Sequence, residues 1–200
     1  MSKVKKMPAR KEVGAGLKQI AKLSLSLLIV TVASALVLSV VNELTCDVIA
    51  MRREAARQEA MACVVPGADV FSDLYSEDTT IDRITGAYQG TNFVGYCVEV
   101  SRNGFGGTIN LMVGVSPSGK VTGVTVLDHG ETPGMGAEAE KPEFLQQYVG
   151  KYGRTEVGGN INAITGATIT SEAVTDGVNA AVTAVINYNA GGDQDYENDV

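Results

Sequence analysis

The most extended pattern along the chain is a run of 20 uncharged residues between Lys22 and Glu43. At helical rise, 20 residues span about 30 Å, the thickness of the hydrocarbon core of a bilayer. A cleaved secretory signal is the alternative, but its apolar core is shorter, and no A-x-A cleavage site follows this run. We therefore predict a retained transmembrane helix at residues 23–42.

Residues 43–67 extend this helix beyond the membrane. They are rich in helix-forming residues and contain no Gly or Pro before Pro66 and Gly67, which end the pattern. The acidic stretch at residues 68–80 indicates a loop or short turns. We expect a juxtamembrane helix over residues 43–67 and a folded domain over residues 68–190.

Alternating apolar positions in the next segments predict strands, at residues 84–89, 93–100, 108–115 and 120–129. The clearest alternation places one apolar face on Ile109, Leu111, Val113 and Val115. Helical patterns follow at residues 142–149, with Pro142 at the start, and from Ser171 to about residue 187. The second helix has one apolar stripe: Val174, Val178, Ala181 and Val185. The pattern predicts an α+β fold with a twisted antiparallel sheet and flanking helices, and an acidic tail at residues 191–200.

Charge is distributed unevenly around this framework. The formal net charge is −7, but residues 1–22 carry +6 and the remaining 178 residues carry −13. An acidic body repels nucleic acid phosphates, which disfavours a DNA- or RNA-binding role. The basic flank of a membrane helix stays in the cytoplasm, so we predict a single-pass protein of the cell (inner) membrane. Its N-terminus is then cytoplasmic and its acidic domain extracytoplasmic.

Metal chemistry is disfavoured by the composition. The chain has one His, His129, and three Cys without a C-x-x-C pair, so a multi-His site is excluded and a zinc or iron–sulfur site is not expected. Cys63 and Cys97 could pair in an oxidising compartment. We assign no metal ligands and no catalytic residues, and any redox chemistry must come from an organic cofactor or a partner.

Two segments carry candidate binding chemistry. Residues 161–174 (INAITGATITSEAV) place four hydroxyl residues before a helix, whose unpaired N–H groups favour an anion: Thr165, Thr168, Thr170 and Ser171. We expect Thr170 or Ser171 to be the N-cap. The alternative to an anion site is a plain capping segment without a ligand. In the loop at residues 129–136 (HGETPGMG), Glu131 and Thr132 offer polar groups and Met135 a soft apolar side chain for a flat ring. An ordinary surface loop is the alternative there.

Residues 162–168 (NAITGAT) resemble the flavinylation motif of the FMN-binding domain family, Asp-x-x-Ser/Thr-Gly-Ala-Thr. The last threonine of that motif carries FMN through a phosphoester bond, which implies covalent FMN on Thr168 beside Thr165, Gly166 and Ala167. Asn162 stands where the family usually has Asp. Residues 131–136 resemble the family's Glu-Thr-Pro-Gly-Leu-Gly loop, which packs against the isoalloxazine ring. This resemblance implies four further cofactor contacts: Glu131, Thr132, Gly134 and Met135.

The resemblance covers residues 23 to about 188. The domain occurs in the G subunit of the Rnf ion-translocating ferredoxin:NAD oxidoreductase and in the C subunit of the sodium-translocating NADH:quinone reductase. It implies a flavinylated electron-carrying subunit rather than a standalone enzyme, with the other complex subunits and a flavin transferase as partners. The short length and residues 66–69 (PGAD) favour the Rnf type. The quinone reductase type and a non-redox, membrane-tethered anion-binding or assembly module are the alternatives.

Overall fold

The computed structural model describes residues 10–74 and 78–191, with side chains described for all of these except 10–19, 21 and 191. Of the two charged end segments predicted above, the basic one (1–22) lies partly outside these residues. The acidic tail (191–200) lies outside them except for Gly191. The chain divides into two compact units, Met1–Arg53 and Glu54–Val200, and each is described by itself.

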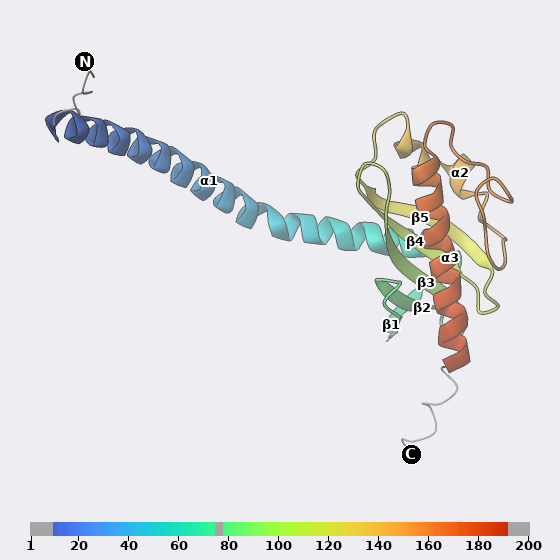
Figure 1. The fold of residues 1–200 in the computed structure, drawn as a ribbon. Coiled ribbons are helices and arrows are strands. Elements are labelled where there is room, and N and C mark those ends of the chain that lie inside the picture. Colours follow the sequence, from blue (N-terminus) through green and yellow to red (C-terminus); the bar gives the residue numbers. More distant parts are fainter. Residues whose placement is uncertain (1–9, 75–77, 192–200) are drawn as a thin grey trace. The chain divides into compact units, whose positions relative to one another are not determined.

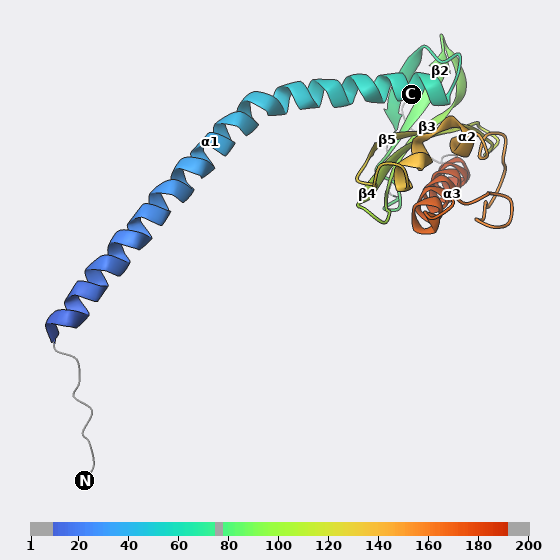
Figure 2. The same cartoon turned by 90° about the horizontal axis from the view of Figure 1, so that it is seen from above.

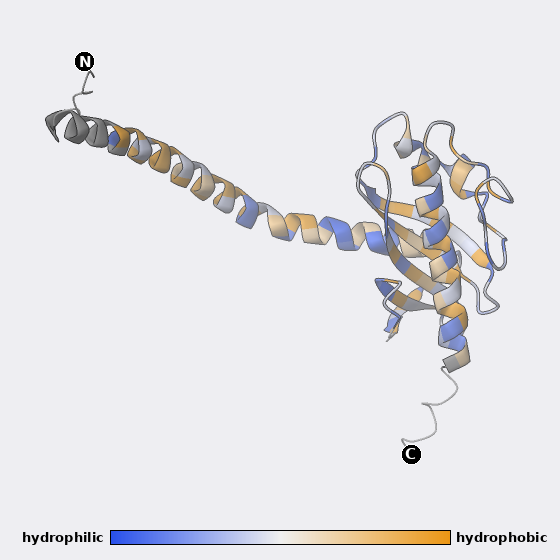
Figure 3. Ribbon diagram, in the orientation of Figure 1, coloured by the Kyte–Doolittle hydropathy of each residue, from blue (hydrophilic) through white to orange (hydrophobic). Residues whose placement is uncertain are grey.

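Helix α1 (Arg10–Val64) runs without interruption through residues 23–42 and ends three residues before the predicted end at residue 67. The chain contains no Gly or Pro between residues 17 and 65, so nothing interrupts the helix. It ends just before Val65, whose position ahead of Pro66 disfavours helical backbone. Figure 3 shows apolar colours along the stretch that precedes Glu43. Among the described residues, one helix is long and apolar enough to cross a membrane, with its candidate span inside Lys22–Val64.

The second unit contains a five-stranded sheet in which every strand pairs with its sequence neighbour (Figure 1). All four pairings are antiparallel. The strands are β1 (Val70–Leu74), β2 (Arg83–Gln89), β3 (Asn92–Asn103), β4 (Thr108–Val115) and β5 (Val121–His129). The α+β class and the antiparallel sheet predicted from the sequence are confirmed.

Strand β1 corrects the expectation of a loop across residues 68–80. It pairs with β2 through partners such as Val70 with Tyr88 and Phe71 with Ala87. The side chain of Asp73 bonds to Thr85 and Arg57, on β2 and α1. Because these contacts are long-range, the acidic local sequence does not reveal them.

Three helices follow the sheet: the 3₁₀ helix η1 (Gly136–Glu140), α2 (Pro142–Leu145) and α3 (Thr168–Gly191). The predicted helix at 142–149 begins at Pro142 as expected but ends four residues early. Helix α3 begins at Thr168, three residues before the predicted Ser171. The expected N-cap at Thr170 or Ser171 is therefore wrong, because the Ser171 N–H already bonds to the Ala167 carbonyl at 3.0 Å as a helical residue.

Helix α3 covers one face of the sheet, and Figure 2 shows it on the same side as α2. Its predicted apolar stripe is buried: Val174, Val178, Ala181 and Val185. The stripe shares a core with the predicted inward face of β4: Ile109, Leu111, Val113 and Val115. A Cβ on Gly177 would lie 2.6 Å from Leu111 Cδ1, so the helix approaches the sheet closely at that glycine. The predicted apolar faces of both elements are confirmed.

The opposite face of the sheet holds the last turns of α1, within the second unit. Met61 and Val64 form a separate cluster with Cys97 and Met112. Burial raises the pKa of the Cys97 thiol to about 12, and the three cysteines, Cys63 among them, are free. The second compact unit starts at Glu54 and so includes these turns of α1.

Polar contacts hold the same end of α1. The Arg57 guanidinium, mostly buried, pairs with Glu99 on β3 and with Asp73 on β1, and donates to Thr85 Oγ1 at 3.1 Å. These hydrogen bonds and the positive charge lower the pKa of Asp73, with the Thr85 hydroxyl as the largest cause. This half-buried cation thus joins the helix end to three strands, in addition to the apolar packing.

The close approach of Val64 to the sheet gives a testable prediction. A Cβ on Gly114 would lie 2.2 Å from the Val64 carbonyl oxygen, and backbone cannot move aside as a side chain can. We expect Gly114→Ala to lower the free energy of unfolding by about 1–3 kcal/mol through overpacking. Urea unfolding of the full chain in detergent measures this change.

Gly159→Ala is the matched control, because a Cβ there would meet its nearest atom at an ordinary 3.5 Å. Equal stabilities of the two variants would show that α1 does not pack closely on Gly114 of β4.

Candidate functional site

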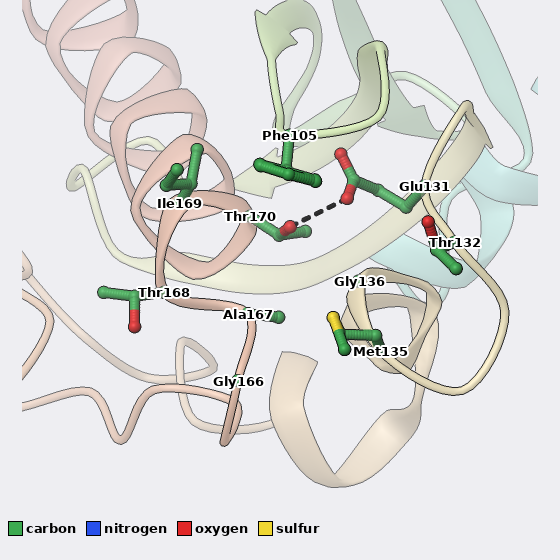
Figure 4. Close-up of a pocket in the computed structure, with 10 residues that line it drawn as sticks. All are labelled: Phe105, Glu131, Thr132, Met135, Gly136, Gly166, Ala167, Thr168, Ile169 and Thr170. Atoms are coloured by element: carbon green, nitrogen blue, oxygen red, sulfur yellow. Dashed lines mark hydrogen bonds between the residues drawn. The ribbon is translucent and has the colours of Figure 1, made fainter.

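The two segments with candidate chemistry meet at one end of the sheet. They enclose a cavity of about 310 Å³ together with the loop between β3 and β4 (Figure 4). Its size lies at the lower end of the range for small-molecule sites. The lining comes from the β3–β4 loop, the segment after β5 and the first turn of α3: Phe105, Glu131, Thr132, Met135, Gly136, Gly166, Ala167, Thr168, Ile169 and Thr170.

Six of the eight predicted site residues line this cavity: Glu131, Thr132, Met135, Gly166, Ala167 and Thr168. The other two, Thr165 and Gly134, are exposed and lie outside the lining, each next to a lining residue in sequence. Both occupy the central positions of tight turns. The structure thus brings the two predicted segments together, and the role of each residue toward a cofactor stays a prediction.

Each of these segments is shaped by a turn with glycine in its third position. The Met135 N–H bonds to the Thr132 carbonyl at 3.2 Å, and Gly134 between them has a φ of +76°. The Ala167 N–H bonds to the Ile164 carbonyl at 3.0 Å, and Gly166 has a φ of +81°. This is the type II pattern, in which the third residue takes the left-handed conformation that glycine adopts at no steric cost.

Ser171 fastens the second turn to α3. Its hydroxyl donates to the Ala167 carbonyl and accepts the Ile164 N–H, both at 2.9 Å, and its side chain is fully buried. Ser171, which lies in the first turn of α3, therefore bonds to both ends of the preceding turn at residues 164–167. This use of the hydroxyl explains why α3 extends back to Thr168 without a side-chain N-cap.

Thr168 is the first residue of α3 and is exposed at the edge of the cavity (Figure 4). The N–H groups of Thr168, Ile169 and Thr170 precede the first intrahelical bond, which Ser171 makes, and so have no partner within the helix. Such donors, at the positive end of the helix dipole, favour an anion. An exposed hydroxyl and an anion-binding helix end thus lie within one turn.

Glu131 is the charged group of the cavity, with 7% of its surface exposed. Its Oε2 accepts a hydrogen bond from Thr170 Oγ1 at 2.9 Å, and its Oε1 accepts one from the Gly106 N–H at 3.0 Å. Its own N–H donates to His129 Nδ1 at 3.1 Å. Both carboxylate oxygens are therefore occupied by donors of the protein.

Three apolar side chains frame the opening of the cavity: Phe105, Met135 and Ile169, with exposed fractions of 73%, 49% and 52%. Phe105 and Ile169 were missed from the sequence. The available signal for Phe105 was its position within NGFGG, a glycine-rich hairpin in which a lone aromatic residue has no core to join. No signal in the sequence distinguishes Ile169 from the core residues of α3, because the face on which it lies depends on the residue at which the helix begins.

These residues fit a flavin mononucleotide. Apolar side chains around the opening suit a flat aromatic ring. A Cβ at Gly166 would meet no atom within 4 Å, so open space lies beside the Thr168 turn. Phosphate matches the unpaired N–H groups of the helix start. When bound, FMN supplies the redox chemistry that these side chains lack, and Thr168 and the first turn of α3 would hold its phosphate.

The comparison with protein families agrees with this assignment, because residues 104–183 match the FMN-binding domain family. The G subunit of the proton-translocating ferredoxin:NAD(+) oxidoreductase complex of Clostridium ljungdahlii is 34% identical over 168 residues, spanning 79% of this chain and 87% of that protein. The G subunit of the ion-translocating oxidoreductase complex of Methanosarcina acetivorans is 32% identical over 176 residues, spanning 82% and 94%. Among solved structures, NqrC of Shewanella oneidensis is 20% identical with a TM-score of 0.48, covering 65% of this chain and 72% of that one.

Residues 104–183, which contain β4, β5, most of α3 and every residue that lines the cavity, form an FMN-binding domain. With similarity that extends over most of its length, the chain belongs to the family of G subunits of ion-translocating oxidoreductase complexes. Its N-terminal apolar helix anchors it to the membrane.

The Ser171 contacts give a second prediction. Ser171→Ala removes one donor and one acceptor and leaves the Ile164 N–H without its partner. We expect the variant to lose about 1–3 kcal/mol of unfolding free energy. Hydrogen exchange should also become faster at residues 164–167, measured by mass spectrometry.

Thr183→Ala is the control, because its hydroxyl bonds only to the Asn179 carbonyl on an exposed face of α3. If the two variants exchange alike at residues 164–167, Ser171 does not fasten the turn.

Proposed function

We propose that the chain is the membrane-anchored electron-transfer subunit of an Rnf-type complex that couples ferredoxin:NAD electron transfer to ion translocation. Its FMN is attached covalently through a phosphoester to Thr168 Oγ1. The observation that carries this proposal is the exposed Thr168 hydroxyl, at the cavity edge and at a helix start, within residues that match the FMN-binding domain. Support for the complex comes from relatives named as its G subunits.

The attachment requires a hydroxyl that a second protein can reach. The Oγ1–P bond forms as a phosphoanhydride bond of an activated flavin donor breaks. The other half of the donor leaves with the hydroxyl proton, and the side chain gains one FMN less one water. A flavin transferase is the partner that makes this bond, and the exposed backbone at Gly166 gives it access. After attachment, the first-turn N–H groups of α3 offset the phosphate charge. Asn162, exposed and held through its backbone by Gln147, is available to the same partner.

The protein's part in electron transfer is to hold the cofactor and to control its surroundings. A covalent tether keeps the cofactor on the chain through repeated turnovers. Phe105, Met135 and Ile169 shield the ring from water, and Thr132 offers a hydroxyl at the cavity wall. The side chains themselves carry no electrons, so the protein acts within a complex and not as a standalone enzyme.

The membrane topology follows from charge. Residues 1–22 form a basic cytoplasmic segment, residues 23–42 cross the membrane once, and residues 43–67 lead to the extracytoplasmic flavin domain at residues 68–190. The excess of +6 on the N-terminal flank supports this orientation. The other subunits of the complex are the remaining partners, since a single membrane helix has no ion pathway of its own.

Thr168 provides the decisive prediction. When the full chain is produced together with a flavin transferase and run on a denaturing gel, we expect a fluorescent band, because a covalent flavin survives denaturation. Thr168→Ala removes the acceptor oxygen and should abolish the fluorescence completely.

Thr183→Ala is the matched control, because it removes an exposed threonine hydroxyl further along the same helix and outside the cavity, and it should stay fluorescent. A dark wild-type band, or a fluorescent Thr168→Ala band, would contradict the proposed attachment. A dark band combined with thermal stabilisation by inorganic phosphate would instead favour the non-redox anion-binding module, which the unpaired N–H groups of α3 also fit.

A further inference from the structure

The Glu131 carboxylate joins two chain segments that face each other across the cavity. Thr170 belongs to the first turn of α3, and Gly106 belongs to the loop between β3 and β4. Both donate to Glu131, one to each oxygen, and Figure 4 shows the bond to Thr170. The carboxylate is therefore a polar link between these two walls.

The surroundings of this carboxylate are shaped to its size. A Cβ on Gly104 would lie 2.1 Å from Glu131 Oε1, and a Cβ on Gly136 would lie 2.1 Å from Oε2. Any larger residue at either position would displace the carboxylate. Two glycines from separate segments thus leave room for one buried acid. No ion pair among the described residues includes Glu131, so its hydrogen bonds are what stabilises the buried carboxylate.

The backbone of Glu131 is held as well. Its N–H donates to His129 Nδ1, which requires that nitrogen to be unprotonated. The other ring nitrogen, Nε2, lies 3.3 Å from Glu140 Oε2 at the end of η1. The backbone of Glu131 is thereby held, through His129, between the end of β5 and the 3₁₀ helix, and this fixes the point from which its side chain extends.

We propose that Glu131 is a positioning residue: it braces the Phe105 loop and the first turn of α3 at a fixed separation, so that the cavity keeps its shape before and after cofactor attachment. Phe105 and Ile169 stand on the two braced segments, and the brace sets the gap between them. This role differs from the direct ring contact that the sequence motif implies for Glu131. It rests on the proposed function only in identifying the occupant of the cavity.

The test measures whether a change on α3 loosens the β3–β4 loop. The probe is hydrogen exchange at residues 103–108 in the full chain, purified in detergent without flavin from cells that lack the transferase. Thr170→Val keeps the side-chain shape but removes the hydroxyl that anchors Glu131. We expect exchange in the loop to become roughly fivefold to tenfold faster, the factor that corresponds to one hydrogen bond. Glu131→Gln, which replaces one acceptor by a donor, should act in the same direction.

Two controls separate the brace from general destabilisation. Thr170→Ser restores the hydroxyl and should return exchange to the wild-type rate, whereas Thr183→Val alters an exposed threonine of the same helix and should leave the loop unchanged. A second readout uses the absence of Trp from the chain: the tryptophan that Phe105→Trp introduces should be more readily quenched by acrylamide when combined with Thr170→Val.

Wild-type exchange in Thr170→Val would overturn the proposal, and so would exchange in Thr170→Ser as fast as in Thr170→Val. Both measurements use flavin-free protein, so they stand whether or not Thr168 carries FMN. Failure of the brace is thus distinguishable from failure of the proposed attachment, which the denaturing gel reports.

Discussion

The packing of α3 across the sheet is the constraint on which the site depends. Its buried stripe meets β4 at close range where Gly177 lies over Leu111, so the helix has little freedom to slide. With the helix fixed, its first turn lies beside the β3–β4 loop and the segment after β5. Core packing thus determines where the Thr168 hydroxyl stands, although Thr168 itself is exposed.

Around this fixed helix start, tight turns of the backbone and two buried polar side chains shape the cavity together. Two type II turns with glycine at the left-handed position present Met135 and Thr168 to the same cavity. Hydrogen bonds from Ser171 and to Glu131 then hold those turns against the helix. This division suits an electron carrier, in which the cofactor supplies the chemistry and the polypeptide supplies a constant geometry.

The sequence predicted those features that a local pattern encodes. Alternation at 108–115 and the stripe from Val174 to Val185 identified both halves of the core, and two motifs identified two of the three segments that line the cavity. What it missed depends on contacts between distant residues. Strand β1 forms because β2 is there to pair with it, and Ser171 bonds backward to Ile164 and so lets α3 begin at Thr168. Phe105 enters the cavity only through the position of its hairpin.

The central claim is that Thr168 carries the flavin of a membrane-anchored electron carrier. The most direct measurement is the mass of the tryptic peptide containing Thr168, from protein isolated out of its native membrane. The account predicts an increase equal to one FMN less one water, with fragmentation placing it on the Thr168 side chain. An unmodified peptide, or a flavin found on Thr165 or Thr170 instead, would contradict it.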